Sequence, residues 1–194
     1  MTRTQTMAGG GEPAPPPYNP TVSWTKGATA TATQDTTPEA VLRGIKEGRW
    51  RQQIEAVRQA DGEAREQLKK RLPAVLFSGQ FSERKAAALL RHSGLLCCDL
   101  DALGNRLTPL RDALAKNVHV VGGFVSPSGN GLKILVRVPP DATRHKESFR
   151  ALERYFRERY SVQIDKACSD VSRLCFASFD PDAWANLQAI EFPV

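Results

Sequence analysis

The spacing of hydrophobic and polar positions predicts a long helix early in the chain. Within residues 38–60, Val41, Leu42 and Ile45 fall every three or four residues and so share one helical face. Thr37 stands just before this stretch and is a residue type that caps helix N-termini. The amphipathic pattern predicts that one face of this helix packs onto the rest of the protein.

The same reasoning divides the remainder of the chain into helices and strands. The apolar run Leu95–Cys98 is typical of a buried strand, whereas Phe149, Leu152 and Phe156 repeat at helical spacing. Further helices are predicted over residues 63–72, 82–91, 107–116 and 143–160. Strands are predicted over residues 74–77, 94–98, 118–125, 132–138 and 173–179, with 162–165 short and extended. This order predicts an α+β fold with a mixed or antiparallel sheet and flanking helices.

Residues 1–37 differ in composition from the rest of the chain. They hold many Thr and Pro residues and few apolar ones, without a periodic pattern. Such a segment buries too little apolar surface to offset its chain entropy, so we predict a disordered tail. The tail either serves solubility alone or includes a Pro-rich docking segment around residues 15–18. The folded part is therefore expected to span residues 38–194.

The charge balance favours a polyanionic partner. The 194-residue chain carries a formal net charge of +6, from 27 Lys and Arg against 21 Asp and Glu. Nucleic acid and nucleotides are the usual partners of such a basic excess. Basic residues gather at 69–71 and along 143–160, where they suit either a solvated face or the wall of a nucleic-acid groove.

Membrane insertion and secretion find no support in the sequence. No stretch of 18 apolar residues occurs, and the start of the chain lacks the apolar core of a secretory signal. The four cysteines form no CxxC pair, so neither a zinc site nor a disulfide framework is expected. These observations favour a cytoplasmic protein without a membrane partner.

An acidic pair follows the predicted strand 94–98. Asp99 and Asp101 are two residues apart, so an extended backbone points both carboxylates to the same side. Two close carboxylates repel each other unless a cation lies between them, and Mg²⁺ or Mn²⁺ prefers such oxygen ligands. The alternative is an acidic turn in which Asp101 caps the next helix.

A glycine-rich loop joins the strands predicted over 118–125 and 132–138. It reads Ser126-Pro127-Ser128-Gly129-Asn130-Gly131, and Lys133 follows just inside the next strand. Glycines let backbone N–H groups approach a phosphate, while Ser128 adds a hydroxyl and Lys133 a charge. The loop is not a Walker A motif, and a plain hairpin loop whose glycines serve only turn geometry is an equal alternative.

A third acidic residue, Asp165, ends the short extended segment 162–165, and Arg173 opens the last predicted strand. In isolation, Arg173 suits a surface ion pair with Asp170. In combination, the acids and the basic, glycine-rich loop supply what a two-metal nucleotidyl-transfer site needs. Three carboxylates hold two divalent cations about 4 Å apart, while the loop and the cations neutralise a triphosphate.

These motifs resemble those of the archaeo-eukaryotic primase superfamily, the primase-polymerases. Asp99-Leu100-Asp101 resembles their first motif, residues 128–133 resemble the second, and Ile164-Asp165 resembles the third. Residues 126–133 and 170–181 look in particular like the primase-like domains known as the VirE N-terminal domain. The resemblance spans about residues 65–182 and departs from the pattern at Lys133, where many members have His.

The resemblance implies an RRM-like primase-polymerase core and DNA-templated nucleotidyl transfer in the replication of a mobile element or phage. A 3′-hydroxyl would attack an α-phosphate, with pyrophosphate leaving. Asp99, Asp101 and Asp165 would be catalytic ligands of Mg²⁺ or Mn²⁺. The implied nucleotide-binding residues are Ser128, Gly129, Gly131, Lys133 and Arg173. The implied partners are a single-stranded DNA template, nucleoside triphosphates and a replicative helicase. Residues 38–72 would form a helical extension and residues 73–182 the catalytic core.

Three other functions fit parts of the sequence. The main alternative is a catalytically inactive nucleic-acid-binding module on the same fold, although the retained acids favour activity. A nucleotide-sugar transferase also uses a DxD motif, but the loop with Lys133 and the basic helix disfavour it. A structural adaptor in a mobile-element complex is supported only by the Pro-rich tail.

Overall fold

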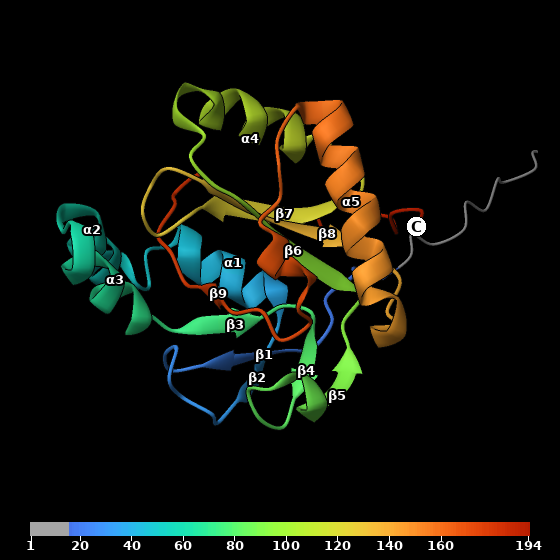
Figure 1. The fold of residues 1–194 in the computed structure, drawn as a ribbon, viewed down its shortest axis with the longest axis horizontal. Helices are drawn as coiled ribbons and strands as arrows, with labels where there is room; N and C mark the ends of the chain where they lie inside the picture. Colours follow the sequence, from blue (N-terminus) through green and yellow to red (C-terminus); the bar gives the residue numbers. More distant parts are fainter. Residues whose placement is uncertain (1–15) are drawn as a thin grey trace, which may run out of the picture.

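Two four-stranded sheets form the framework of the computed structural model, which describes residues 16–194 (Figure 1). The first has the order β2 (Gln34–Thr36), β1 (Val22–Thr25), β3 (Ala74–Leu76), β9 (Cys175–Phe176). The second has the order β10 (Trp184–Ala185), β7 (Val120–Val125), β8 (Leu132–Arg137), β6 (Leu95–Leu100). A separate hairpin pairs β4 (Gly79–Phe81) with β5 (Leu89–His92). Every pairing between these strands is antiparallel, so the predicted α+β class with an antiparallel sheet is confirmed.

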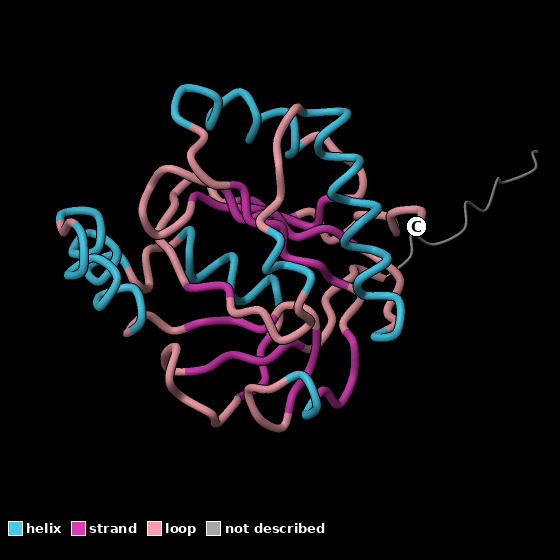
Figure 2. The backbone as a smooth tube through the Cα atoms, in the orientation of Figure 1, coloured by secondary structure: helices cyan, strands magenta, loops and turns pink. Residues whose placement is uncertain are grey.

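Helices and the first sheet cover the two faces of the second sheet. On one face pack α4 (Leu107–Ala115) and α5 (His145–Tyr160). On the other face lie α1 (Pro38–Lys46) and the first sheet (Figures 1 and 2). The helices α2 (Arg51–Gln59) and α3 (Gly62–Lys70) contact each other at one side of the molecule (Figure 1). Within residues 16–194, no helix is long and apolar enough to cross a membrane.

The alternation of side chains along β6 fixes which residues face which layer. Leu96, Cys98 and Leu100 belong to the core under α4 and α5, whereas Leu95 and Cys97 pack on the side of α1 and the first sheet. Successive strand residues point to opposite faces. Asp99 therefore points with Leu95 and Cys97 toward the first sheet, away from α5.

Several predicted elements need correction. The helix predicted over 38–60 is two helices, because the chain turns at Gly48 with φ +81°. The helix predicted over 82–91 is wrong: only a short 3-10 turn, η1 (Ala86–Ala88), precedes β5, because residues 89–92 pair with β4. The final strand shrinks from 173–179 to the two residues of β9.

The predicted disorder of residues 1–37 is wrong for the part that the structure describes, and residues 1–15 lie outside it. β1 lies between β2 and β3 in the first sheet, with Val22 and Ser23 fully buried. Tyr18 of the predicted docking segment donates its hydroxyl to the carbonyl of Ser93. The polar composition of this segment was misleading, because β1 is buried by pairing with β3, some 50 residues later in the chain.

A buried histidine pair joins β5 to the start of α5. Nε2 of His92 lies 3.1 Å from Nδ1 of His145, and the backbone N–H of Gly94 donates to Nδ1 of His92. Nδ1 of His92 is thus an acceptor, and its Nε2 donates to His145. Burial, together with the neighbouring His145, lowers the pKa of His92 from 6.5 to about 4. Burial also lowers the pKa of His145.

Acidification should therefore destabilise the fold through this pair. Between pH 6.5 and about 4, the unfolded chain binds a proton at His92 that the folded chain does not, so stability falls as the pH is lowered through this window. Between pH 7 and pH 5 we expect His92 to account for a loss of about 2 kcal/mol in the free energy of unfolding. Urea denaturation of the wild type and His92→Gln at both pH values measures this difference.

His119→Gln, at a histidine outside the pair, is the matched control and should keep the wild-type pH dependence. An equal loss of stability in the wild type and in His92→Gln would show that His92 does not cause it.

Candidate functional site

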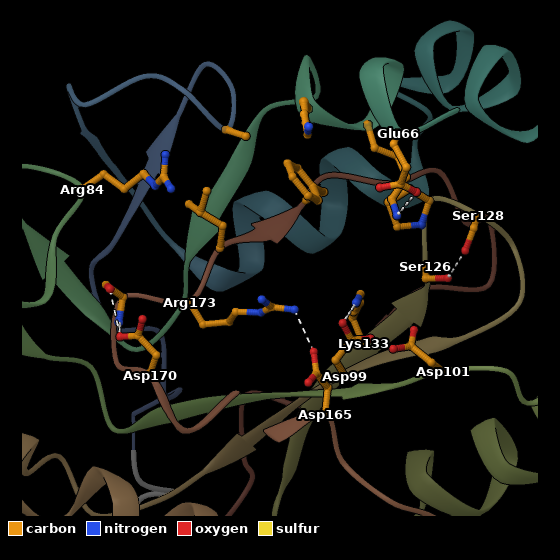
Figure 3. Close-up of a pocket in the computed structure, with 17 residues that line it drawn as sticks. Glu66, Arg84, Asp99, Asp101, Ser126, Ser128, Lys133, Asp165, Asp170 and Arg173 are labelled. Carbon is orange, nitrogen blue, oxygen red and sulfur yellow. Dashed lines mark hydrogen bonds and ion pairs between the residues drawn. The ribbon is translucent and has the colours of Figure 1, made fainter. Parts of the chain in front are cut away.

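A pocket of about 520 Å³ is lined by both sheets, by α3 and by the loop between β7 and β8 (Figure 3). Its lining carries charged side chains of both signs. The acidic ones are Glu66, Asp99, Asp101, Asp165 and Asp170, and the basic ones are Lys69, Lys70, Arg84, Lys133 and Arg173. No residue of α5 is among them, so the basic face of that helix does not form a wall of this pocket.

The three predicted acids, Asp99, Asp101 and Asp165, meet at one corner of the pocket, which we call the acidic corner. Asp99 lies near the end of β6, Asp101 follows the strand, and Asp165 precedes the short turn η4 (Lys166–Ser169). The backbone N–H of Asp165 donates to the carbonyl oxygen of Asp99 at 2.9 Å, which holds this loop against β6. One carboxylate oxygen from each residue lies within 4.8 Å of the other two.

Asp99 is buried with an incomplete set of partners. The residue is 7% exposed, and its Oδ2 forms an ion pair with Nζ of Lys133, which lies opposite it in the register of β6 and β8. Its Oδ1 is buried and has no hydrogen-bond partner. An unsatisfied buried carboxylate oxygen is costly, so its presence in the acidic corner indicates a place for a cation.

Burial and charge act against each other in this ion pair. Burial raises the pKa of Asp99, and the positive charge of Lys133 offsets this only in part. Burial alone would lower the pKa of Lys133, but the negative charge of Asp99 outweighs it and raises the pKa above its ordinary value. Lys133 therefore stays protonated and supplies a permanent positive charge to the corner.

Asp165 and Asp101 differ in their partners. Oδ2 of Asp165 accepts from a guanidinium N–H of Arg173 at 2.8 Å, and its Oδ1 accepts from the backbone N–H of Ala167 at 3.0 Å. The alternative of a surface ion pair between Arg173 and Asp170 is thus wrong. Asp101 is exposed and does not cap the following 3-10 turn, η2 (Gly104–Arg106). The backbone N–H of Gly104 in this turn donates to Oδ1 of Asn130 instead.

The glycine-rich loop is tightly closed on itself. The backbone N–H of Ser126 donates to the carbonyl of Gly131 at 2.8 Å, and Gly129 has a φ of +82°, a conformation that favours glycine. Ser128 and Gly129 are exposed, and Ser128 lines the pocket. Gly131 is buried, and a Cβ there would lie 2.5 Å from the carbonyl of Leu100. The contact with β6 therefore requires a glycine at position 131, and neither Gly131 nor Gly129 lines the pocket.

Arg58 of α2 holds this loop in place and was missed by sequence reasoning. Its Nε donates to the carbonyl of Pro127 at 3.2 Å, and its Nη2 donates to the carbonyl of Phe179 at 2.9 Å. The residue sits on the polar face of an amphipathic helix, and its partners are backbone carbonyls far away in the chain. No signal in the sequence could therefore reveal its role. Arg84, on the opposite wall of the pocket, was also missed (Figure 3).

The acidic corner fits a hard divalent cation. All its donors are carboxylate oxygens, among them the unpartnered Oδ1 of the buried Asp99 and the oxygens of the exposed Asp101. Mg²⁺ and Mn²⁺ take such ligands and keep several waters, which the open side of the pocket can accommodate. Softer metals are disfavoured, because none of the three acids brings a nitrogen or sulfur donor.

A family model described as BT4734-like, N-terminal domain, matches residues 67–184, which is more than half of the chain. The chain belongs to this family. In the BT4734-like chain the match begins inside α3 and ends in β10, so it contains the acidic corner, the glycine-rich loop and Arg173. Neither curated proteins nor solved structures gave a match.

The BT4734-like match leaves out the N-terminal strands and α1 and α2. Arg58 thus reaches from outside the matched region to the loop inside it. The description of the family names no activity and no fold. The resemblance to primase-polymerases and the RRM-like core therefore remain predictions.

Removing the Arg58 side chain should loosen the glycine-rich loop. Arg58→Ala leaves two carbonyls without a charged donor, so we expect faster amide hydrogen exchange in residues 126–131 and a loss of about 2 kcal/mol in the free energy of unfolding. Arg43→Ala, at an exposed arginine on α1, is the control. Unchanged exchange in the loop of Arg58→Ala would show that the hydrogen bonds do not order it.

Proposed function

We propose that this protein catalyses DNA-templated nucleotidyl transfer with two divalent cations, Mg²⁺ or Mn²⁺, as a primase or polymerase. The observation that carries the proposal is the acidic corner of Asp99, Asp101 and Asp165 in the same pocket as Lys133 and Ser128 of the glycine-rich loop. Carboxylates that gather at one point suit cations, and cations beside a phosphate-binding loop suit a nucleoside triphosphate.

Each wall of the pocket has a role in this proposal. The three acids would hold the cations, which supply positive charge to the reacting α-phosphate and to the attacking and leaving oxygens. Lys133, Arg173 and Ser128, which line the pocket, would bind the triphosphate. Gly131 keeps the loop close to β6 without touching the nucleotide, because it is buried against Leu100.

The basic wall on the other side of the pocket suits the DNA strand. Lys69 and Lys70 lie at the C-terminal end of α3, and Arg84 faces the same pocket from the loop before β5. Lysine and arginine bind the phosphodiester backbone without regard to sequence, as a template-binding surface requires. A single strand fits this proposal better than a duplex, because a template must expose its bases.

A catalytically inactive nucleic-acid-binding module is the second candidate, and one observation favours it. Asp99 and Asp165 are already paired with Lys133 and Arg173, so part of the acidic charge is balanced without a cation. In that case the pocket would bind nucleic acid through its basic wall, and the acids would only position the two basic side chains.

Catalysis is tested by incorporation of labelled nucleotides on single-stranded DNA, with and without a primer, in Mg²⁺ and in Mn²⁺. We expect the wild type to extend the strand and Asp101→Asn to lower the rate at least about 100-fold, because the amide is a far weaker ligand. Asp101 is exposed, so its substitution should leave the fold intact. Asp112→Asn, at an exposed acid of α4, is the control.

Incorporation that is lost only in Asp101→Asn would establish the enzyme. Folded wild-type protein that binds single-stranded DNA yet incorporates nothing in either metal would establish the binding module instead.

The basic wall is tested by the salt dependence of DNA binding. Each phosphate contact to single-stranded DNA adds about 0.7 to the slope of log affinity against log salt concentration. Lys70→Ala combined with Arg84→Ala should therefore lower that slope by about 1.4 in a fluorescence anisotropy titration. Lys116→Ala combined with Arg150→Ala changes the charge equally at exposed positions outside the pocket. Equal slopes in the two double variants would place the DNA elsewhere.

A further inference from the structure

The ammonium of Lys133 lies beside the buried Asp99, at a position that a metal cation could otherwise take. The register of β6 and β8 puts Lys133 directly opposite Asp99, and its ammonium pairs with Oδ2 of Asp99. The side chains of the two residues are only 13% and 10% exposed, so water screens this pair weakly. Figure 3 shows Lys133 between Asp99 and Asp101, with Asp165 close by.

The carboxylate oxygens of the corner are unequally occupied. Oδ2 of Asp99 is taken by Lys133, and both oxygens of Asp165 accept hydrogen bonds, from Arg173 and from the backbone of Ala167. Oδ1 of Asp99 has no partner, and Asp101 is exposed. Only Asp99 and Asp101 thus offer a carboxylate oxygen that no other group in the corner engages, which is a set for one ion.

The charge balance of the acidic corner also favours a single divalent cation. Three carboxylates carry three negative charges, and Lys133 and Arg173 balance two of them through direct ion pairs. One divalent cation then leaves the corner with a single positive charge. A second cation would add two more positive charges next to a protonated lysine, in a weakly screened environment, which Coulomb repulsion opposes.

We propose that the ammonium of Lys133 occupies one of the two cation positions of the acidic corner, so that the protein without nucleotide takes up a single divalent cation. The proposal rests on the metal site of the proposed function and specifies its occupancy. Lysine suits this role because its ammonium is a compact point charge. Breaking its buried pair with Asp99 would leave an uncompensated charge, which makes displacement by a metal unfavourable until a bound triphosphate offers the ammonium another negative partner and the second cation can enter.

Mn²⁺ binding without nucleotide tests the proposal directly. Electron paramagnetic resonance counts free Mn²⁺ during a titration of the wild type, of Lys133→Met and of Lys46→Met, an exposed lysine of α1 as the control. We expect one bound Mn²⁺ in the wild type and in the control. Lys133→Met should bind a second ion, or bind the first at least about tenfold more tightly, because a positive charge has left the corner.

Lys133→Gln, which keeps a hydrogen-bond donor for Asp99 without the charge, replaces Lys133→Met if thermal unfolding shows that the methionine variant is not folded. Two Mn²⁺ bound by the wild type, or equal binding by the wild type and the folded Lys133 variant, would overturn this proposal and leave the proposed function standing. No Mn²⁺ binding by any of the proteins would instead overturn the metal site of the proposed function, and this inference with it.

Discussion

The antiparallel pairing of β6 with β8 determines both the core and the chemistry of this protein. Leu95 to Leu100 pair one by one with Arg137 to Leu132. Because strand side chains alternate, this register sends one set of apolar residues under α4 and α5 and places Asp99 face to face with Lys133 on the other side. A shift of β6 by one residue would turn Asp99 toward the helices, away from Lys133, and would turn Leu96, Cys98 and Leu100 toward the first sheet. The core that stabilises the sheet thus also fixes the position of the charges.

Burial strengthens the interaction between the charges of Asp99 and Lys133. A carboxylate and an ammonium in water attract each other weakly, whereas Asp99 and Lys133 interact where little solvent screens them. The same burial penalises the unpartnered oxygen of Asp99. Asp101, two residues later and exposed, carries no such penalty. The corner therefore combines a fixed, buried carboxylate with an accessible one, and the proposed cation site needs both.

The sequence predicted the local features of the site better than the interactions between distant segments. Alternation along one strand was enough to put Asp99 and Asp101 on the same side. The nearness of Asp165 was expected only from the combination of motifs, because its hydrogen bond to the backbone of Asp99 joins segments 66 residues apart. Helical propensity was misleading at 82–91, where the pairing of β5 with β4 outweighs it. Nothing local revealed Arg58, since its partners are carbonyls of two remote loops.

The strand order of the first sheet has a consequence for how the chain folds. Its central strands, β1 and β3, come early in the chain, but its edge strand β9 lies at residues 175–176, and Arg173 just before it completes the charged corner. During synthesis, the sheet and the corner cannot close until β9 has left the ribosome, about 100 residues after β3. Such dependence on contacts between distant segments predicts slow folding. Nascent chains that stop before residue 173 would carry the acidic pair and the glycine-rich loop without the arginine that balances Asp165.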